Sequence, residues 1–311
     1  MHFFNKLNNH LTRKPALKAK RLPTMYPSAA SCRDMDNPAI VYGACMRQQW
    51  YRCAGYKESD PSGEYSQYIF AAGNLWEDWL TEQCKQMGIW EANSVKWSLP
   101  EYYLSGEVDI VVRDPETDEV IIIESKTYSS NNYKAKSELI GLSGRTPTPK
   151  VQNVMQAALY LMYFSKPENG GVKRVLLTYF DRSCAGPENN QEFWITLNPV
   201  EEGKTFIHID CKNSKGASFS YDMPGITMEN LLARYTELIN SLRESQEVPP
   251  RPDYEHVYSD EKVIRLYNAG EIAKTNYEKW ESNKTKYPIG DWQCAYCNYK
   301  TLCKKQQETL A

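Results

Sequence analysis

Histidine is scarce in this chain of 311 residues: it holds only four, and no two of them stand at the spacing of a metal-ligand pair. This argues against a zinc hydrolase built on paired histidines. Long apolar runs are missing as well. The longest, Ala157 to Phe164, is far shorter than the roughly 20 residues that a helix needs to cross a bilayer, so we expect no membrane partner.

A large net charge is also missing, although the charge is unevenly distributed. The chain carries −2 overall, whereas residues 1–33 hold seven Lys and Arg and no acid. We interpret residues 1–33 as a basic N-terminal arm that contacts nucleic acid. The alternative is an organellar targeting peptide, but the segment has only two serines, both near its end, whereas transit peptides tend to be rich in serine.

The stretch 106–126 carries the strongest chemical signal. Asp109 lies in one apolar run, Glu124 and Lys126 lie in the next, and the polar residues 114–118 between them predict a hairpin turn. Residues two apart in a strand point to the same face, so Glu124 and Lys126 project together and Asp109 can face them. Two carboxylates and an ammonium suit a hard divalent cation, although a lone Glu-x-Lys is usually only an ion pair.

The order of these residues resembles the signature of the PD-(D/E)xK nuclease superfamily, and two flanking segments resemble motifs of its RecB-like branch. The matching residues, in chain order, are Gly73, Glu77, Asp109, Glu124, Lys126, Gln156 and Tyr160. The resemblance covers about residues 70–165, a third of the chain. Two departures are visible: no proline precedes Asp109, and Glu77 stands where the CRISPR-associated group commonly has histidine.

The resemblance implies an α/β fold, with a restriction-endonuclease-like core in which helices flank a central mixed sheet. It implies hydrolysis of DNA with Mg²⁺ or Mn²⁺. The implied metal ligands are Asp109, Glu124 and the carbonyl of Ser125, with Glu77 acting through water or on a second ion. Lys126 would position or deprotonate the attacking water. The remaining two motif residues, Gln156 and Tyr160, would orient Lys126 and the phosphate.

Three cysteines near the end of the chain, Cys294, Cys297 and Cys303, have the spacing C-x2-C-x5-C, which is typical of metal or cluster ligands. A fourth ligand must come from upstream. Cys45, with its following Arg and aromatic residues, resembles the distant first ligand of RecB-like nucleases that carry a 4Fe–4S staple, such as the CRISPR-associated exonucleases and AddB-type subunits. Cys32 and Cys53 are the alternative fourth ligands, and Zn²⁺ is the alternative metal.

The remaining cysteines, Cys84, Cys184 and Cys211, are expected to be buried as small apolar residues. Residues 64–224 are expected to form the nuclease core, and residues 34–63 with 225–311 a helical iron–sulfur lobe. Within the core we expect helices at 64–87 and 150–165 and strands at 94–99, 102–113, 119–127, 172–181, 192–197 and 206–210. Further helices are expected at 227–244 and 261–279.

Residues 128–149 read as a polar loop beside the site. The basic residues in and after it are candidate DNA contacts: Lys134, Lys136, Arg145 and Lys150.

Together these features predict an exonuclease on single-stranded DNA or DNA ends in phage or bacterial replication, recombination or repair. A structure-specific endonuclease and a non-catalytic nucleic-acid-binding protein are the alternatives. No P-loop or helicase motif is visible, so any ATP-driven unwinding would come from a helicase or another partner. No secretory signal is visible either. We expect a cytoplasmic location in a bacterial or phage-infected cell, in preference to a mitochondrial one.

Overall fold

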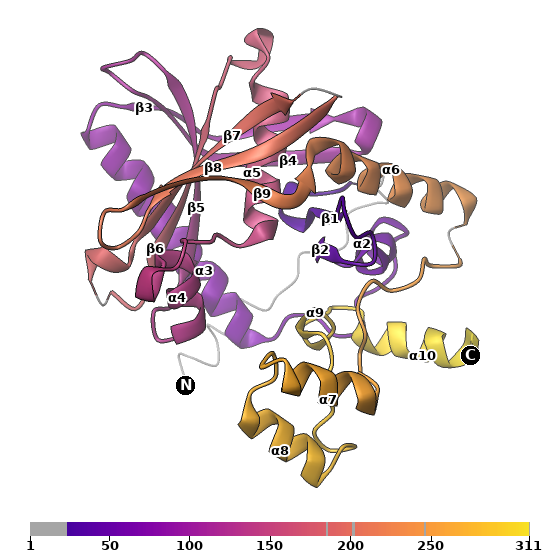
Figure 1. Cartoon of the computed structure of the whole chain (residues 1–311). Helices are drawn as coiled ribbons and strands as arrows, with labels where there is room; N and C mark the ends of the chain where they lie inside the picture. The colour runs from indigo at the N-terminus through magenta and orange to yellow at the C-terminus, as the bar shows by residue number, and fades with distance from the viewer. Residues whose placement is uncertain (1–23, 185, 201–202, 246, 311) are drawn as a thin grey trace, which may run out of the picture. The chain divides into compact units, whose positions relative to one another are not determined.

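The computed structural model describes residues 24–184, 186–200, 203–245 and 247–310. The chain forms two compact units (Figure 1). The first consists of Gly63–Asn240 and the described part of Met1–Gly43, and the second of Ala44–Ser62 and the described residues from Ser241 onward.

The first unit is built on a seven-stranded mixed sheet with the strand order β3-β4-β5-β6-β7-β8-β9. These strands are Trp90–Leu99, Leu104–Arg113, Val120–Tyr128, Val175–Asp181, Gln191–Val200, Lys204–Lys212 and Ser218–Thr227. All neighbours pair antiparallel except β5 and β6, which are parallel. A parallel pair needs a crossover connection. Here the crossover contains α4 (Tyr133–Ile140) and α5 (Val151–Phe164).

Two helices cover opposite faces of this sheet. On one face, α3 (Glu64–Gln86) places Leu80 and Cys84 against a cluster of strand residues that includes Ile123, with Leu176 packed against the same cluster. On the other face, the amide of Asn153 on α5 donates to the hydroxyl of Tyr179 at 2.8 Å, and Tyr179 is an odd number of residues from Leu176 on β6. Residues an odd number apart on a strand point to opposite faces. The predicted α/β fold, a mixed sheet flanked by helices, is therefore confirmed.

Residues 24–33, which the sequence analysis placed in the basic arm, belong to the folded first unit. Met25 is fully buried. Its backbone N–H donates to the carbonyl of Tyr103, and its carbonyl accepts the N–H of Ser105 in β4. Further on, β1 (Ser31–Arg33) pairs antiparallel with β2 (Val41–Gly43). These residues fold into the first unit because their apolar side chains are buried. Residues 1–23, with six of the seven basic residues of the predicted arm, lie outside the described residues.

Three further differences separate the predicted elements from the observed ones. Residues 133–140, predicted as loop, form α4, and β9 was not predicted at all. The single helix expected at 261–279 is two helices, α7 (Asp260–Asn268) and α8 (Lys274–Ser282). The first ends because Gly270 takes a left-handed conformation, and the N–H groups of Gly270 and Glu271 bond back to its last turn.

The second unit joins two distant stretches of sequence. Its helices are α2 (Met46–Cys53), α7, α8, α9 (Trp292–Ala295) and α10 (Lys300–Leu310). Asp60 connects the two stretches: its N–H donates to the carbonyl of Asn298 at 2.9 Å, and its carboxylate accepts from Thr301. Compact units need not fold independently, so the predicted domain boundaries stay a prediction. Within the described residues, no helix is both long and apolar enough to cross a membrane.

Candidate active site

The candidate site forms where β4 and β5 separate. Backbone pairing between these strands stops at Ile110 and Ile123, and the next residues toward the opening are Asp109 and Glu124. The carboxylate of Asp109 accepts the N–H of Ser125 at 2.9 Å. A side-chain oxygen thus replaces a backbone carbonyl in the ladder, and this holds Asp109 beside the strand that carries Glu124.

Glu124 is the most buried acid of the group, with no exposed surface. Its Oε1 contacts the ammonium of Lys126, which lies two residues further along the same strand and on the same face. Its Oε2 is shielded from solvent and has no hydrogen-bond partner within the described residues. A buried carboxylate oxygen without a partner is costly, so a ligand at this oxygen would stabilise the site.

Glu77, on α3, adds a third carboxylate. Burial raises the pKa of Asp109 well above its usual value, and the charges of Glu124 and Glu77 raise it further. The pKa of Glu77 is raised as well, first by burial and then by Glu124. Burial lowers the pKa of Lys126, but Glu124, Asp109 and Glu77 outweigh that effect and raise it. With three carboxylates and one ammonium, the site carries a formal charge of −2 when all four groups are ionised.

The donor set fits a hard divalent cation. Its free donors are carboxylate oxygens, which Mg²⁺ and Mn²⁺ prefer, and a divalent ion would balance the excess charge. As they stand, no three His, Cys, Asp or Glu side chains of the described chain form a metal-binding group. In the first unit, Lys126 engages one oxygen of Glu124 and the N–H of Ser125 engages one of Asp109. Among the described residues, Oε2 of Glu124 is the carboxylate oxygen of this site that is both shielded from solvent and without a hydrogen-bond partner.

Gln156 and Tyr160 lie together on α5, one turn apart. The amide of Gln156 donates to the hydroxyl of Tyr160 at 2.6 Å, and this hydroxyl donates to the carbonyl of Glu107 at 3.2 Å. Burial, then the charges of Glu124 and Asp109, raise the pKa of Tyr160 well above its usual value, so its hydroxyl stays protonated. The pair therefore fastens α5 to β4 two residues before Asp109.

The four basic candidates lie on and after α4. Lys134 is exposed and comes within 3.9 Å of Glu138 on the same helix, Lys136 is half-buried, and Arg145 and Lys150 are exposed. Lys150 is the N-cap of α5, and its N–H is held by the hydroxyl of Tyr179. Their contact with DNA stays a prediction.

An aromatic group beside Glu77 was missed by the sequence analysis. Trp76 stacks on Phe180 with ring centroids 5.5 Å apart, and Trp79 packs edge-on against both rings. The three line a cavity of about 640 Å³, and Trp79 is 48% exposed. The signal in the sequence is the spacing of the two tryptophans, three residues apart on one helix. Their partner Phe180 comes from β6, and no local pattern shows this pairing.

The four cysteines predicted as ligands belong to the second unit. Burial raises the pKa of Cys294 to about 12, and the charges of Cys45, Asp291, Cys297 and Cys303 add to this. The charges of the other three thiols therefore act on Cys294, but these cysteines do not form a metal-binding group as they stand in the described chain. The backbone N–H of Tyr299 donates to the sulfur of Cys297 at 3.4 Å.

The aromatic and basic context of Cys45 is buried. Arg47 and Tyr51 follow Cys45 in α2. The guanidinium of Arg47 donates a hydrogen bond to the hydroxyl of Tyr51 at 2.9 Å, and both side chains donate to the amide oxygen of Gln306 on α10. The alternative fourth ligands are in other places: Cys32 is part of β1 in the first unit, and Cys53 ends α2 beside Arg52. Which cysteine is the fourth ligand stays a prediction.

The three remaining cysteines differ in burial. Cys84 and Cys211 are buried, as predicted. The prediction for Cys184 is wrong, because it is exposed in the turn after β6, where its backbone is left-handed.

Comparison with known proteins gives one family. A sequence model described as PD-(D/E)XK nuclease superfamily matches residues 35–304, which is most of the chain. The match spans Glu77, Asp109, Glu124, Lys126 and the cysteines of the second unit. Searches of the curated proteins and of the solved structures give no match.

Proposed function

Because this chain belongs to the PD-(D/E)XK nuclease superfamily, whose members hydrolyse nucleic-acid phosphodiester bonds, we propose that it is a Mg²⁺- or Mn²⁺-dependent exonuclease acting on single-stranded DNA or DNA ends. The observation that carries the proposal is the cluster of three carboxylates, the buried Glu124 with the partly buried Glu77 and Asp109, together with Lys126. Its excess negative charge and its unpartnered oxygen suit a divalent cation that binds a phosphate.

The chain's own residues would divide the work of hydrolysis. Asp109, Glu124 and the carbonyl of Ser125 would hold the metal, with Glu77 acting through water or on a second ion, and the bound metal would act as a Lewis acid and lower the pKa of its water. Lys126, held by Glu124, presents an ammonium that stabilises negative charge developing on the phosphate.

A preference for unpaired DNA is supported by the aromatic cavity beside Glu77. Trp76, Trp79 and Phe180 form a partly exposed aromatic surface, and Trp76 is the sequence neighbour of Glu77 on α3. Stacking of an unpaired base on such a surface is worth about 1–3 kcal/mol and is indifferent to sequence. This suits an enzyme that holds a strand end. The proposed setting is DNA replication, recombination or repair in the cytoplasm, with a helicase supplying any unwinding.

The test uses purified full-length protein with linear and circular single-stranded DNA. Linear DNA should be degraded with Mg²⁺ or Mn²⁺ and not with EDTA, whereas the circle should survive. The substitutions Asp109→Asn, Glu124→Gln and Lys126→Ala should each lower the rate at least about 100-fold, since each removes a charge from the reacting centre. Labelled ends show whether cleavage begins at a terminus.

Asp118→Asn is the matched control. Asp118 lies in the turn of the same hairpin, is 85% exposed and pairs only with Arg113 among the described basic residues, so this variant should keep full activity. Full activity in any of the three site variants would refute the assignment. Rapid cleavage of the circle would replace the exonuclease with an endonuclease, and tight DNA binding without cleavage under any metal would favour a non-catalytic binding protein.

For the second unit we propose that Cys45, Cys294, Cys297 and Cys303 hold a 4Fe–4S cluster. The electrostatic coupling of Cys294 to the other three supports this ligand set. An N–H donor to the sulfur of Cys297 is the kind of hydrogen bond that tunes such clusters. The four thiols bind Zn²⁺ equally well by their chemistry, so metal content distinguishes the two.

A further inference from the structure

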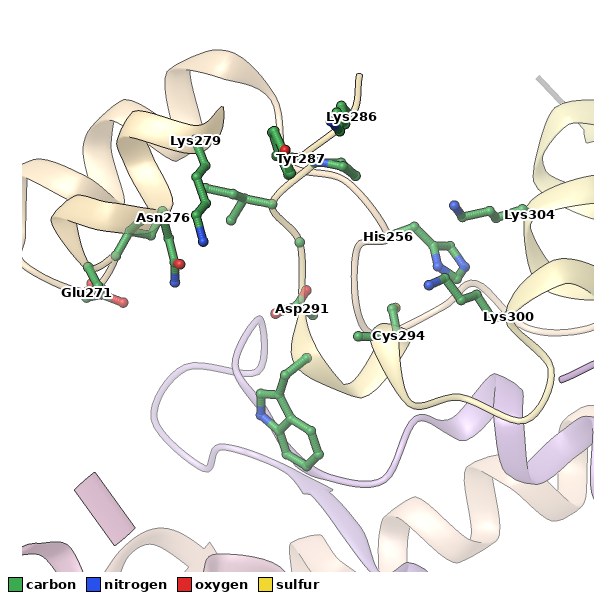
Figure 2. A pocket seen from close by; sticks show the side chains of 17 residues that line it. His256, Glu271, Asn276, Lys279, Lys286, Tyr287, Asp291, Cys294, Lys300 and Lys304 are labelled. Atoms are coloured by element: carbon green, nitrogen blue, oxygen red, sulfur yellow. The ribbon is translucent and has the colours of Figure 1, made fainter. Parts of the chain in front are cut away.

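A second cavity, separate from the acidic site, lies within the second unit. It encloses about 690 Å³ between α8, the segment leading to α9, and the start of α10 (Figure 2). This volume lies in the range of pockets that bind small molecules and is ample for one nucleotide. The residues that matter here are His256, Lys279, Lys286, Trp292, Lys300 and Lys304.

The charge of the cavity is positive although that of the chain is negative. Four lysines line it, against the two carboxylates of Glu271 and Asp291. Asp291 is already engaged, since it accepts from the hydroxyl of Tyr258 at 2.6 Å and the N–H of Glu255 at 2.7 Å. None of the four lysines forms an ion pair with an acid in the part of the chain that the structure describes. Four ammonium groups around one cavity repel one another unless an anion lies between them.

His256 gives an independent reason for a ligand. Both of its ring nitrogens are shielded from solvent, and neither has a hydrogen-bond partner within the described residues. Burial lowers the pKa of His256, and the charges of Lys304 and Lys300 lower it further, so the ring is neutral and carries one N–H donor. Figure 2 shows the imidazole between Lys300 and Lys304. A shielded donor without an acceptor is costly, and an anionic oxygen would satisfy it.

We propose that this cavity binds the phosphate of a nucleotide. Lys300 and Lys304 supply compact positive charges for the phosphate oxygens, and His256 supplies a neutral N–H. Trp292, 65% exposed at the cavity, offers a ring face for the base. The phosphate comes either from the end of a DNA strand or from a free nucleotide. This function goes beyond cleavage, because none of the proposed catalytic residues lines the cavity, although Cys294, one of the proposed cluster ligands, does.

The first test titrates the full-length protein with dTMP, thymidine and inorganic phosphate by calorimetry. We expect dTMP to bind at least tenfold more tightly than thymidine, which lacks the phosphate. The double variant Lys300→Gln/Lys304→Gln should lose at least tenfold in dTMP affinity, and His256→Ala should lose less. Lys274→Gln is the matched control, because Lys274 lies on the same α8, is 76% exposed and does not line the cavity.

A second arm identifies the source of the phosphate, using Asp109→Asn full-length protein and a short oligonucleotide with or without a terminal phosphate. Competition with dTMP by the phosphorylated form alone identifies a strand end. Binding of dTMP without such competition identifies a free nucleotide. Equal affinity for thymidine and dTMP would overturn the proposal, as would unchanged dTMP affinity in the natively folded double variant. Because calorimetry does not require cleavage, these results stand whether or not the nuclease assay succeeds.

Discussion

At the scale of single residues, Asp181 shows how a buried charge organises the surroundings of the site. It ends β6, and its Oδ1 accepts the N–H groups of Ser130 and Ser183, each at 3.0 Å. Burial raises the pKa of Asp181, but these hydrogen bonds outweigh it and lower the pKa to about 2. The carboxylate therefore fixes the segment that follows β5, the strand of Glu124 and Lys126.

Asp181→Ala should lower the free energy of unfolding by about 2–3 kcal/mol at pH 7, because two backbone donors lose their acceptor. The pKa of Asp181 is lower in the folded state than in the unfolded state. Its contribution is therefore complete above about pH 4 and declines as the pH falls toward 2. Urea unfolding at pH 7 and pH 3 measures this: the gap between wild type and variant should narrow at pH 3.

Asp36→Ala serves as the control, since Asp36 is exposed and should change stability by less than about 0.5 kcal/mol. A gap that widens on acidification would show that the sign assigned to Asp181 is wrong.

The residues of the acidic site illustrate what a sequence reveals at this scale. Asp109, Glu124 and Lys126 were predictable because the two-residue period of a strand fixes which side chains share a face. The hydrogen bond from the N–H of Ser125 to Asp109 could not be predicted, because it depends on where the backbone pairing of β4 and β5 stops. The contact of Tyr160 with the carbonyl of Glu107 likewise depends on how α5 lies on the sheet.

At the scale of elements, α3 carries a glycine that the helix does not need. Gly73 lies in the helix interior, and a Cβ built on it would meet nothing within 4 Å. Glycine in a helix interior costs about 0.5–1 kcal/mol relative to alanine, because its backbone loses more freedom on folding. Gly73→Ala should therefore raise the free energy of unfolding by that amount and the melting temperature by about 1–3 °C.

Gly225→Ala gives the opposite case in the same unit. Gly225 has φ +71°, and a Cβ there would collide with the carboxylate of Asp34, so this variant should melt at a lower temperature. Thermal unfolding of both variants measures the pair. A destabilised Gly73→Ala would mean that the open space over α3 is occupied in the folded protein.

The helices and strands also show which elements a sequence pattern predicts and which it does not. The long helix α3 and the strands β4 and β5 were predictable because their apolar periods are regular. The division between α7 and α8 was not, because the apolar pattern continues through Gly270 while its left-handed backbone ends the helix. The strand β9 was not predicted because its buried positions are confined to its second half.

At the scale of the whole molecule, the four cysteines proposed as cluster ligands come from both ends of the sequence. A cluster joining Cys45 to Cys303 would close a loop of most of the chain, worth about 4–5 kcal/mol if it constrains the unfolded state as a disulfide does. Anaerobically purified protein should be brown, absorb near ~400 nm and contain about four irons per chain. Serine at Cys45, Cys294, Cys297 or Cys303 should lower both the iron content and the melting temperature.

Cys184→Ser is the control, because Cys184 is exposed and should leave iron and melting unchanged. Stoichiometric zinc without iron would replace the cluster by a zinc site. Normal iron content in Cys45→Ser, together with an iron deficit in Cys53→Ser or Cys32→Ser, would show that the fourth ligand is Cys53 or Cys32 and not Cys45. The spacing of the last three cysteines was readable from sequence because it is local, whereas the fourth partner depends on the return of the chain.

The second unit is assembled from two segments that are far apart in the sequence, and this affects how the protein folds during synthesis. Ala44–Ser62 leaves the ribosome well before Ser241, and the whole of Gly63–Asn240 is synthesised in between. At about 5–20 residues per second, this delay is roughly ten to thirty-five seconds. During that time Trp50 and Tyr51, fully shielded in the finished protein, have no partner from the C-terminal segment. Chains interrupted in this interval would therefore expose the aromatic side chains of α2 to chaperones and proteases, so we expect translation speed to affect yield.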